Sequence, residues 1–290
     1  MIMNLKRLIR NEVFKIVKEG ISEEGVPDLK YYAFDWDDNI LFMPTTIIVL
    51  DDNDEEVKMS TEDFAEYRGQ IGNENFEYKG KTIIGYANNP YRNFTVEGDK
   101  NFLTDCMLAK SGPSWGDFVE CINGGSVFAI ITARGHSPEV MKEATYNLII
   151  SNHQGIDSKR CVENLKRYIS LIMDQDASGL SDKEVIDDYL ELCYFAPVTN
   201  PGFGGGSASN PEEGKIIALR HFISYCKELS NEIGVKGLFK NDMLNKEPKI
   251  GFSDDDPRNI EKISGFLEKE YPEKPVDIYL TKGGEKRKVN

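Results

Sequence analysis

Two aspartates separated by one residue stand directly after an apolar stretch near the start of the chain. The order is Tyr31-Tyr32-Ala33-Phe34-Asp35-Trp36-Asp37-Asp38-Asn39, and a second apolar run follows. If a strand ends at Asp35, the turn presents the Asp35 carboxylate at one point with the carbonyl and carboxylate of Asp37. Oxygen ligands of this kind suit Mg²⁺. Because Asp and Asn also favour ordinary turns, this stretch alone leaves a metal site and a plain turn as equal interpretations.

A second acidic stretch repeats this arrangement late in the chain. Ile250-Gly251-Phe252-Ser253 runs into Asp254-Asp255-Asp256, and a helix is expected to follow from Pro257. In open α/β sheets, ligands bind outside the carboxyl ends of the strands. Two strands that end in carboxylates therefore favour one shared acidic site over two unrelated turns.

Two further side chains have the chemistry to bind an oxyanion. An apolar strand ends in Thr132-Ala133-Arg134, which offers a hydroxyl for one phosphoryl oxygen and a guanidinium for a bidentate anion contact. The segment Asn210-Pro211-Glu212-Glu213 has the features of a helix start and places Lys215 in the first turn, where the helix dipole disfavours a cation. Each observation has a plain alternative, because Thr132 can simply end a strand and Lys215 can be a surface lysine.

Alternating strands and helices must position these residues. Apolar periodicity predicts helices over residues 4–20, 61–67, 115–122 and 137–152, a mostly helical stretch over 155–193, and strands over 45–50 and 81–86. The glycine-rich stretch 202–208 lacks the lysine of a P-loop and is expected to be a connector or hinge. The acidic residues 51–54 lack the spacing of a calcium loop and are expected to form a hairpin turn. The aromatic stretch 86–94 either lines a pocket or packs within a loop.

The composition excludes several classes of protein. The net charge of -14, from 49 acidic and 35 basic residues, disfavours a general nucleic-acid binder. The five cysteines are scattered without a Cys-x-x-Cys pair, which argues against a disulfide framework or a zinc knuckle and fits a reducing compartment. No apolar run reaches the ~18 residues of a membrane span, and a secretory signal is missing. We therefore expect a cytoplasmic protein without membrane partners, and its oligomeric state stays open.

Taken in order, four of these pieces resemble the motifs of the haloacid dehalogenase-like (HAD) superfamily of phosphohydrolases. The segment Phe34-Asp35-Trp36-Asp37-Asp38-Asn39-Ile40-Leu41 resembles motif I, Ile130-Ile131-Thr132 motif II, Lys215 motif III and Phe252-Ser253-Asp254-Asp255 motif IV. Motif III is a single lysine, for which Lys236, Lys240 and Lys249 are alternative candidates. Asn39 stands where the family usually has Thr or Val, and we expect little effect on the chemistry.

The resemblance implies an α/β fold with a Rossmann-like parallel sheet flanked by helices and an inserted cap. It divides the chain into an N-terminal helix (1–28), a catalytic core (29–42 and 114–290, with a helical insertion over about 155–209) and a cap-like insertion (43–113).

The resemblance also implies a Mg²⁺-dependent phosphatase that acts on small phosphorylated substrates. Asp35 would be the nucleophile that forms an aspartyl-phosphate, and Asp37 would protonate the leaving group and then activate water. Thr132 and Lys215 would bind the transferring phosphoryl oxygens. The other residues expected around the phosphate are Asp38, Asn39, Ala133 and Arg134. The expected ligands of Mg²⁺ are Asp35, Asp37, Asp254 and Asp255.

Two alternatives stay open beside this interpretation. Thr132-Ala133-Arg134 and the pair Asp254-Asp255 are reminiscent of polynucleotide end phosphatases, although the acidic net charge disfavours a nucleic-acid end as substrate. A binding or scaffold protein that keeps the fold without activity is less consistent with so many chemically competent side chains. The sequence does not identify the physiological substrate.

Overall fold

A computed structural model of the chain describes residues 31–173, 176–203, 210–235, 249–273, 276–282 and 285–289. The predicted N-terminal helix and most of the glycine-rich stretch lie outside the described residues. The strands are β1 (Tyr31–Phe34), β2 (Leu41–Phe42), β3 (Thr46–Asp51), β4 (Glu56–Ser60), β5 (Phe76–Tyr78), β6 (Lys81–Tyr86), β7 (Lys110–Ser111), β8 (Phe128–Thr132), β9 (Tyr194–Pro197), β10 (Ile250–Asp254), β11 (Val276–Leu280) and β12 (Arg287–Lys288). The α-helices are α2 (Thr61–Tyr67), α3 (Asp99–Leu108), α4 (Trp115–Gly124), α5 (Pro138–Ile150), α6 (Ser158–Met173), α7 (Asp182–Leu192), α8 (Pro211–Val235) and α9 (Pro257–Glu270). Short 3₁₀ turns are η2 (Arg92–Phe94), η3 (Val96–Gly98), η4 (His153–Gly155) and η5 (Ala177–Gly179).

The central sheet has the strand order β12-β11-β10-β1-β8-β9 within the described part of the chain. The pairs from β11 to β9 are parallel, and β12 runs antiparallel to β11. Phe34 of β1 pairs with Ser253 of β10 and with Ile130 of β8. This register ends the three strands at the same edge of the sheet, as the sequence predicted.

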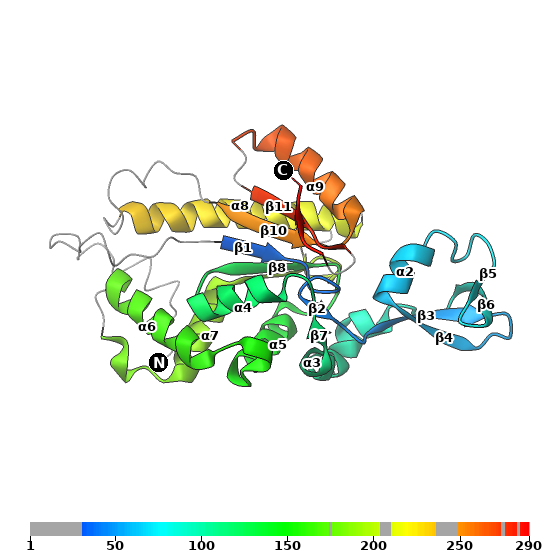
Figure 1. Cartoon of the computed structure of the whole chain (residues 1–290), viewed down its shortest axis with the longest axis horizontal. Coiled ribbons are helices and arrows are strands. Elements are labelled where there is room, and N and C mark those ends of the chain that lie inside the picture. Colours follow the sequence, from blue (N-terminus) through cyan, green and yellow to red (C-terminus); the bar gives the residue numbers. More distant parts are fainter. Residues whose placement is uncertain are drawn as a thin grey trace.

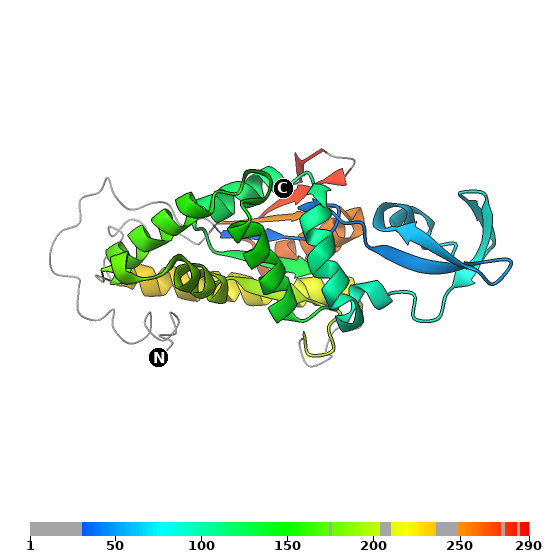
Figure 2. The same ribbon diagram turned by 90° about the horizontal axis from the view of Figure 1, so that it is seen from below.

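Helices cover both faces of this sheet (Figures 1 and 2). Side chains alternate along a strand, so Phe34 points into one core and Ala33 into the other. The first core packs strand residues such as Phe128 against α3, α4, α5, α6 and α7. The second packs strand residues such as Phe252 against α8 and α9. The predicted mixed α/β class, a parallel-containing sheet flanked by helices, is confirmed.

A second sheet is inserted between β1 and β8. Its strands follow the antiparallel order β4-β3-β6-β5, and α2 packs with them around a small core that includes Val49, Met59 and Ile83. We call β3 to β6 together with α2 the inserted sheet. It projects from one end of the molecule (Figure 1). The chain leaves the core through β2 and returns through β7, and these two strands pair antiparallel to each other.

Local sequence signals explain where several elements begin and end. Ser137 accepts a hydrogen bond from the Val140 amide at the start of α5, and Asp256 caps α9 in the same way. Gly125 ends α4 in the left-handed conformation that glycine adopts at low cost. The predicted hairpin turn after β3 is confirmed, because the amides of Asn53 and Glu55 both donate to Asp51.

Two elements differ from the sequence prediction. The range taken as a helical insertion contains α6 and α7, but it also contains β9, which is a parallel strand of the central sheet. The range expected to form a cap-like insertion, 43–113, contains α3, which packs on the core through Phe102 and Cys106. No described helix has both the length and the hydropathy needed to cross a bilayer.

Candidate functional site

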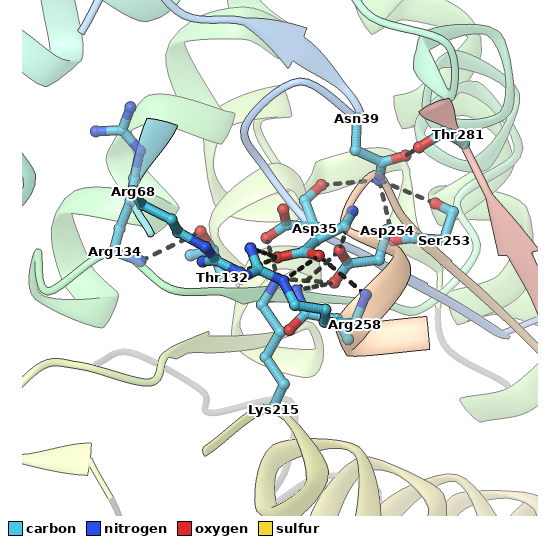
Figure 3. Close-up of polar contacts among 12 residues, drawn as sticks. Asp35, Asn39, Arg68, Thr132, Arg134, Lys215, Ser253, Asp254, Arg258 and Thr281 are labelled. Carbon is cyan, nitrogen blue, oxygen red and sulfur yellow. Dashed lines mark hydrogen bonds and ion pairs between the residues drawn. The ribbon is translucent and has the colours of Figure 1, made fainter. Parts of the chain in front are cut away.

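The carboxyl ends of β1, β8 and β10 bring the predicted site residues together. In the described sheet, β1 lies between β8 and β10. The strands that follow β1 in the sequence are therefore placed first on one side of it and then on the other. Such a switch point is where open α/β sheets bind ligands. Figure 3 shows side chains from these strand ends, with Asp35 and Asp254 at the end of the Lys215 side chain.

Lys215 is the fifth residue of α8 and is almost fully buried. Its Nζ lies 2.7 Å from Asp254 Oδ2 and 3.1 Å from Asp35 Oδ1. Burial alone would lower the pKa of this amine, but the carboxylates of Asp254 and Asp35 raise the pKa above its ordinary value. The buried amine is therefore charged across the physiological pH range.

The structure distinguishes among the lysines considered for motif III. Lys215 reaches the acidic residues, whereas Lys249 is exposed just before β10. Lys236 and Lys240 lie outside the described residues. The geometry thus supports Lys215 among the lysines considered for motif III.

Asp254 is fully buried and firmly oriented by donors. The Asn259 side chain donates to both of its oxygens, at 3.0 and 3.1 Å. The Asp256 amide donates to Oδ1 at 3.0 Å. Together with Lys215, these donors hold the Asp254 side chain in one orientation.

Three carboxylates share the charge of this one amine. Burial raises the pKa of Asp35 to about 7, although Lys215 opposes the shift, and the nearby charge of Asp254 adds to it. Burial also raises the pKa of Asp255 well above its ordinary value, and Asp254 again adds to the shift. If all three are ionised, three negative charges and one ammonium leave a net charge of -2. A buried group with this charge binds protons or a cation.

The acidic residues fit a divalent cation. One carboxylate oxygen each from Asp35, Asp254 and Asp255 lies within 4.8 Å of the others. The Oδ1 of Asp35 is buried, and the Nζ of Lys215 lies 3.1 Å from it. Carboxylate oxygens are the ligands that Mg²⁺ prefers. The side chain of Asp37, which was also predicted as a ligand, lies outside this group.

Asp37 is instead held by Arg134. The guanidinium donates through Nε to Asp37 Oδ2 at 2.8 Å and through Nη2 to Oδ1 at 2.7 Å. Arg134 is buried, with the rings of Phe94 and Phe102 within 4.7 and 4.8 Å of its Cζ. The sequence suggested that Arg134 would clamp a phosphate. In this structure its bidentate contact is made with Asp37, and it orients that carboxylate.

Two residues that the sequence analysis did not assign support this arginine. His136 Nε2 lies 3.1 Å from Arg134 Nη1, and His136 Nδ1 lies 2.7 Å from Asp99 Oδ1. Thr45 accepts a further hydrogen bond from Arg134. Burial and the charge of Arg134 lower the pKa of His136, so the ring is neutral at neutral pH. Arg134 and His136 lie after the end of β8 at Thr132, so the alternation of side chains along a strand gave no signal for their contact.

Asn39 fastens the loop after β1 to the neighbouring strand ends. Its amide nitrogen donates to the carbonyls of Asp35 and Ser253 and to the Ser253 hydroxyl, at 3.0 to 3.1 Å. Its oxygen accepts a hydrogen bond from Thr281 after β11, at 2.9 Å. Asn39 is fully buried, and both polar atoms of its side chain make hydrogen bonds within the protein. Its side chain therefore joins neighbouring strand ends and does not face a phosphate.

The remaining predicted residues lie around the same strand ends. Thr132 is buried, and its Oγ1 accepts a hydrogen bond from the Arg134 amide at 3.3 Å. Ala133 is exposed, and its carbonyl accepts a hydrogen bond from Thr199 at 2.8 Å. Asp38 adopts a φ of 53°, in the left-handed region that Asp tolerates better than most residues. Burial raises the pKa of Asp38 to about 6, and a hydrogen bond with Thr61 of α2 opposes the shift.

Comparison of the chain with protein-family models, with curated proteins and with solved structures found no match. The functional assignment of this site therefore rests on its geometry and on the motif resemblance.

Proposed function

We propose that this chain is a Mg²⁺-dependent phosphohydrolase of the HAD type that cleaves phosphomonoesters through an aspartyl-phosphate intermediate. The observation that carries the proposal is the set of strand-end carboxylates, Asp35, Asp254 and Asp255, gathered at the buried amine of Lys215. A phosphate dianion is repelled by an isolated carboxylate. Positive charge beside the nucleophile offsets this repulsion, and Lys215 supplies part of that charge.

Asp35 is the proposed nucleophile. One of its oxygens bonds to phosphorus while the bond from phosphorus to the leaving-group oxygen breaks, and Asp37 gives its proton to that oxygen. In the second step Asp37 takes a proton from the attacking water, and the bond from phosphorus to Asp35 breaks to release inorganic phosphate. The fork of Arg134 fixes the direction of the Asp37 carboxyl for both proton transfers.

Asp35, Asp254 and Asp255 are the proposed Mg²⁺ ligands, and Asp37 is proposed to add its backbone carbonyl. Bound there, the ion would offset the negative charge of the carboxylates and of the phosphate. Lys215 and the Thr132 hydroxyl are the proposed contacts to the phosphoryl oxygens. The donors to Asp254 hold this part of the site in place before a substrate arrives.

The segment 43–113 is proposed to act as a cap on a HAD-like core. It leaves and rejoins the core through the paired strands β2 and β7, between β1 and β8. Arg68 at the end of α2 contacts Asp256, two residues after Asp254, at 3.1 Å. A cap in this position excludes water from the reaction and selects the leaving group.

The test compares wild type with Asp35→Asn on an aryl phosphate and on a panel of small phosphomonoesters, with and without Mg²⁺. We expect Mg²⁺-dependent turnover, and a loss of kcat on the order of 10⁴-fold in Asp35→Asn, because the amide cannot form the intermediate. Asp54→Asn is the matched control, since Asp54 is exposed and Asn adopts its φ of 60° equally well.

Two outcomes would contradict the proposal. Turnover that persists in Asp35→Asn would assign the chemistry to another group. A folded wild type that binds Mg²⁺ but hydrolyses none of these esters, nor a phosphorylated oligonucleotide, would favour a scaffold of the same fold.

A further inference from the structure

Three aromatic side chains meet on the inserted sheet. Phe64 of α2 packs edge-to-face against Tyr86 and Tyr91, with ring centroids 6.5 and 5.8 Å away, and the two tyrosine rings are 6.0 Å apart. We call these residues the aromatic cluster. Tyr86 is 37% exposed and Tyr91 is 40% exposed, although both rings are large and apolar. Exposed aromatic surface that is grouped in this way is typical of a binding site.

The cluster lies on the side of α2 that faces the core. Thr61, Phe64 and Arg68 follow one another at spacings of three and four residues, which places them on one face of the helix. Thr61 hydrogen-bonds to Asp38 after β1, and Arg68 contacts Asp256 after β10. Phe64 therefore lies between two residues that contact the loops carrying Asp35 and Asp254. Figure 3 shows Arg68 beside these strand ends, where Arg68 and Arg258 both contact Asp256.

A second path connects the cluster to Asp37. Tyr91 directly precedes η2, and the Phe94 amide donates to the Tyr91 carbonyl at 2.8 Å. The ring of Phe94 lies on the guanidinium of Arg134, which in turn holds Asp37. In the proposed reaction Asp37 protonates the leaving group, so the leaving group lies next to Asp37. We take the aromatic cluster, on the helix that contacts the loops carrying Asp35 and Asp254, as the surface that the far end of the leaving group meets.

We propose that the aromatic cluster stacks the base of a nucleoside monophosphate, which makes nucleotides the substrate class of this site. The inference rests on the proposed phosphohydrolase function. A planar π-system stacks well on exposed tyrosine rings regardless of the identity of the base. In a nucleoside monophosphate the ribose separates the base from the oxygen that leaves, whereas the ring of an aryl phosphate is bonded to that oxygen.

The charge of the chain favours free nucleotides over nucleic-acid ends. The net charge is -14, and α2 itself carries Glu62, Asp63 and Glu66. A polynucleotide would bring further phosphates against this acidic surface, at an electrostatic cost that a single phosphate does not carry.

The test measures kcat/KM for adenosine 5′-monophosphate and for ribose 5-phosphate, which differ by the base. We expect the nucleotide to be preferred at least tenfold by wild type. The double variant Tyr86→Leu/Tyr91→Leu should lower this ratio about tenfold, because leucine removes the planar surface. Tyr86→Phe/Tyr91→Phe keeps both rings and should keep the ratio. Tyr146→Leu on α5, outside the inserted sheet, should leave the ratio and the activity on ribose 5-phosphate unchanged.

Three results would overturn the inference. One is equal kcat/KM for the two substrates in wild type. Another is a loss of kcat/KM in the leucine variant that is equal for both substrates, which would indicate a structural role for the tyrosines. The third is a preference of more than tenfold for a phosphorylated oligonucleotide over the mononucleotide, which would assign the cluster to nucleic-acid ends.

A binding measurement separates failure of this inference from failure of the proposed function. Calorimetric titration of Asp35→Asn with adenosine 5′-monophosphate and with ribose 5-phosphate reports on the cluster without turnover. Tighter binding of the nucleotide, lost on adding Tyr86→Leu/Tyr91→Leu, supports the cluster even if no ester is hydrolysed. Equal or undetectable binding of both ligands rejects it, whatever the catalytic assay shows.

Discussion

Asp37 is oriented by a row of contacting side chains that begins at the surface. Asp99 is partly exposed and contacts His136, which contacts Arg134, and Arg134 holds both oxygens of Asp37. A buried arginine with two ordered aromatic neighbours has little freedom to move, so the direction of the Asp37 carboxyl is fixed before substrate binds. At the scale of single residues, this row of contacts is the part of the site that would control proton transfer in the proposed reaction.

Replacing the arginine fork tests that role. Arg134→Lys keeps the positive charge but loses the bidentate contact, so we expect kcat to fall about 10- to 100-fold with a smaller change in KM. The loss should be greater for an alkyl phosphate than for p-nitrophenyl phosphate, whose leaving group departs without a proton. Arg220→Lys, at an exposed bidentate pair with Glu270, is the matched control and should change neither value. Equal losses on the two esters would contradict a role in positioning Asp37.

At the scale of elements, the loop after β1 is packed from outside by the chain that returns from the inserted sheet. The Gly112 amide donates to the Ile40 carbonyl, and the Ser114 amide donates to the Asn39 carbonyl, both at 2.9 Å. A Cβ on Gly112 would lie 2.4 Å from the Asn39 carbonyl oxygen. Asn39 hydrogen-bonds to residues at the ends of β1 and β10 and after β11. A shift of the returning chain at Gly112 would therefore also move the loop that carries the acidic residues.

Gly112→Ala should therefore displace the loop that carries Asp35 and Asp37. We expect the free energy of unfolding to fall by about 1–3 kcal/mol, together with a loss of activity. Gly116→Ala is the control four residues later, because a Cβ there meets no atom within 4 Å and alanine favours the helix by up to about 1 kcal/mol. Urea unfolding of both variants gives the comparison. An unchanged midpoint for Gly112→Ala would show that the loop adapts at no cost.

The sequence predicted the strands that carry the site because each is a short apolar run ending in a polar group. It did not predict β9, since Pro197 lacks an amide donor and argues against a strand. The structure places β9 at the edge of the described sheet, where proline is tolerated. The sequence also did not predict α3, because Phe102 and Cys106 are the buried residues among the ten residues of this helix. The contact between Arg134 and Asp37 joins residues 97 apart and leaves no local signal.

At the scale of the whole molecule, the buried acids make stability depend on pH, and Mg²⁺ bound at the proposed site would change that dependence. The pKa of Asp35 is raised to about 7 by burial, against about 4 in an unfolded chain. Between these values the folded state binds more protons than the unfolded state, so this contribution to stability is present below pH 4 and is lost as pH rises through 7. Asp255 acts in the same direction. A bound divalent cation replaces the protons and removes this loss.

Thermal unfolding in EDTA and in Mg²⁺ measures this linkage. In EDTA we expect the Tm to fall more between pH 5 and pH 8 in wild type than in Asp35→Asn, where the titrating carboxyl is replaced. Addition of Mg²⁺ should raise the Tm of wild type more at pH 8 than at pH 5, because fewer protons compete for the carboxylates at the higher pH. The same increase at both pH values would show that these acids do not bind the ion.

The antiparallel pairing of β2 and β7 places the two ends of the inserted segment side by side, with Leu41 opposite Ser111. A segment attached at two adjacent points can be exchanged, lengthened or shortened while the strands that carry the acids keep their register. The exchangeable part is the inserted sheet itself, because Thr45, Phe94 and Phe102 of the same segment contact Arg134, which orients Asp37. In the proposed phosphohydrolase, a different sheet between these contacts would change the choice of ester and keep the fork on Asp37.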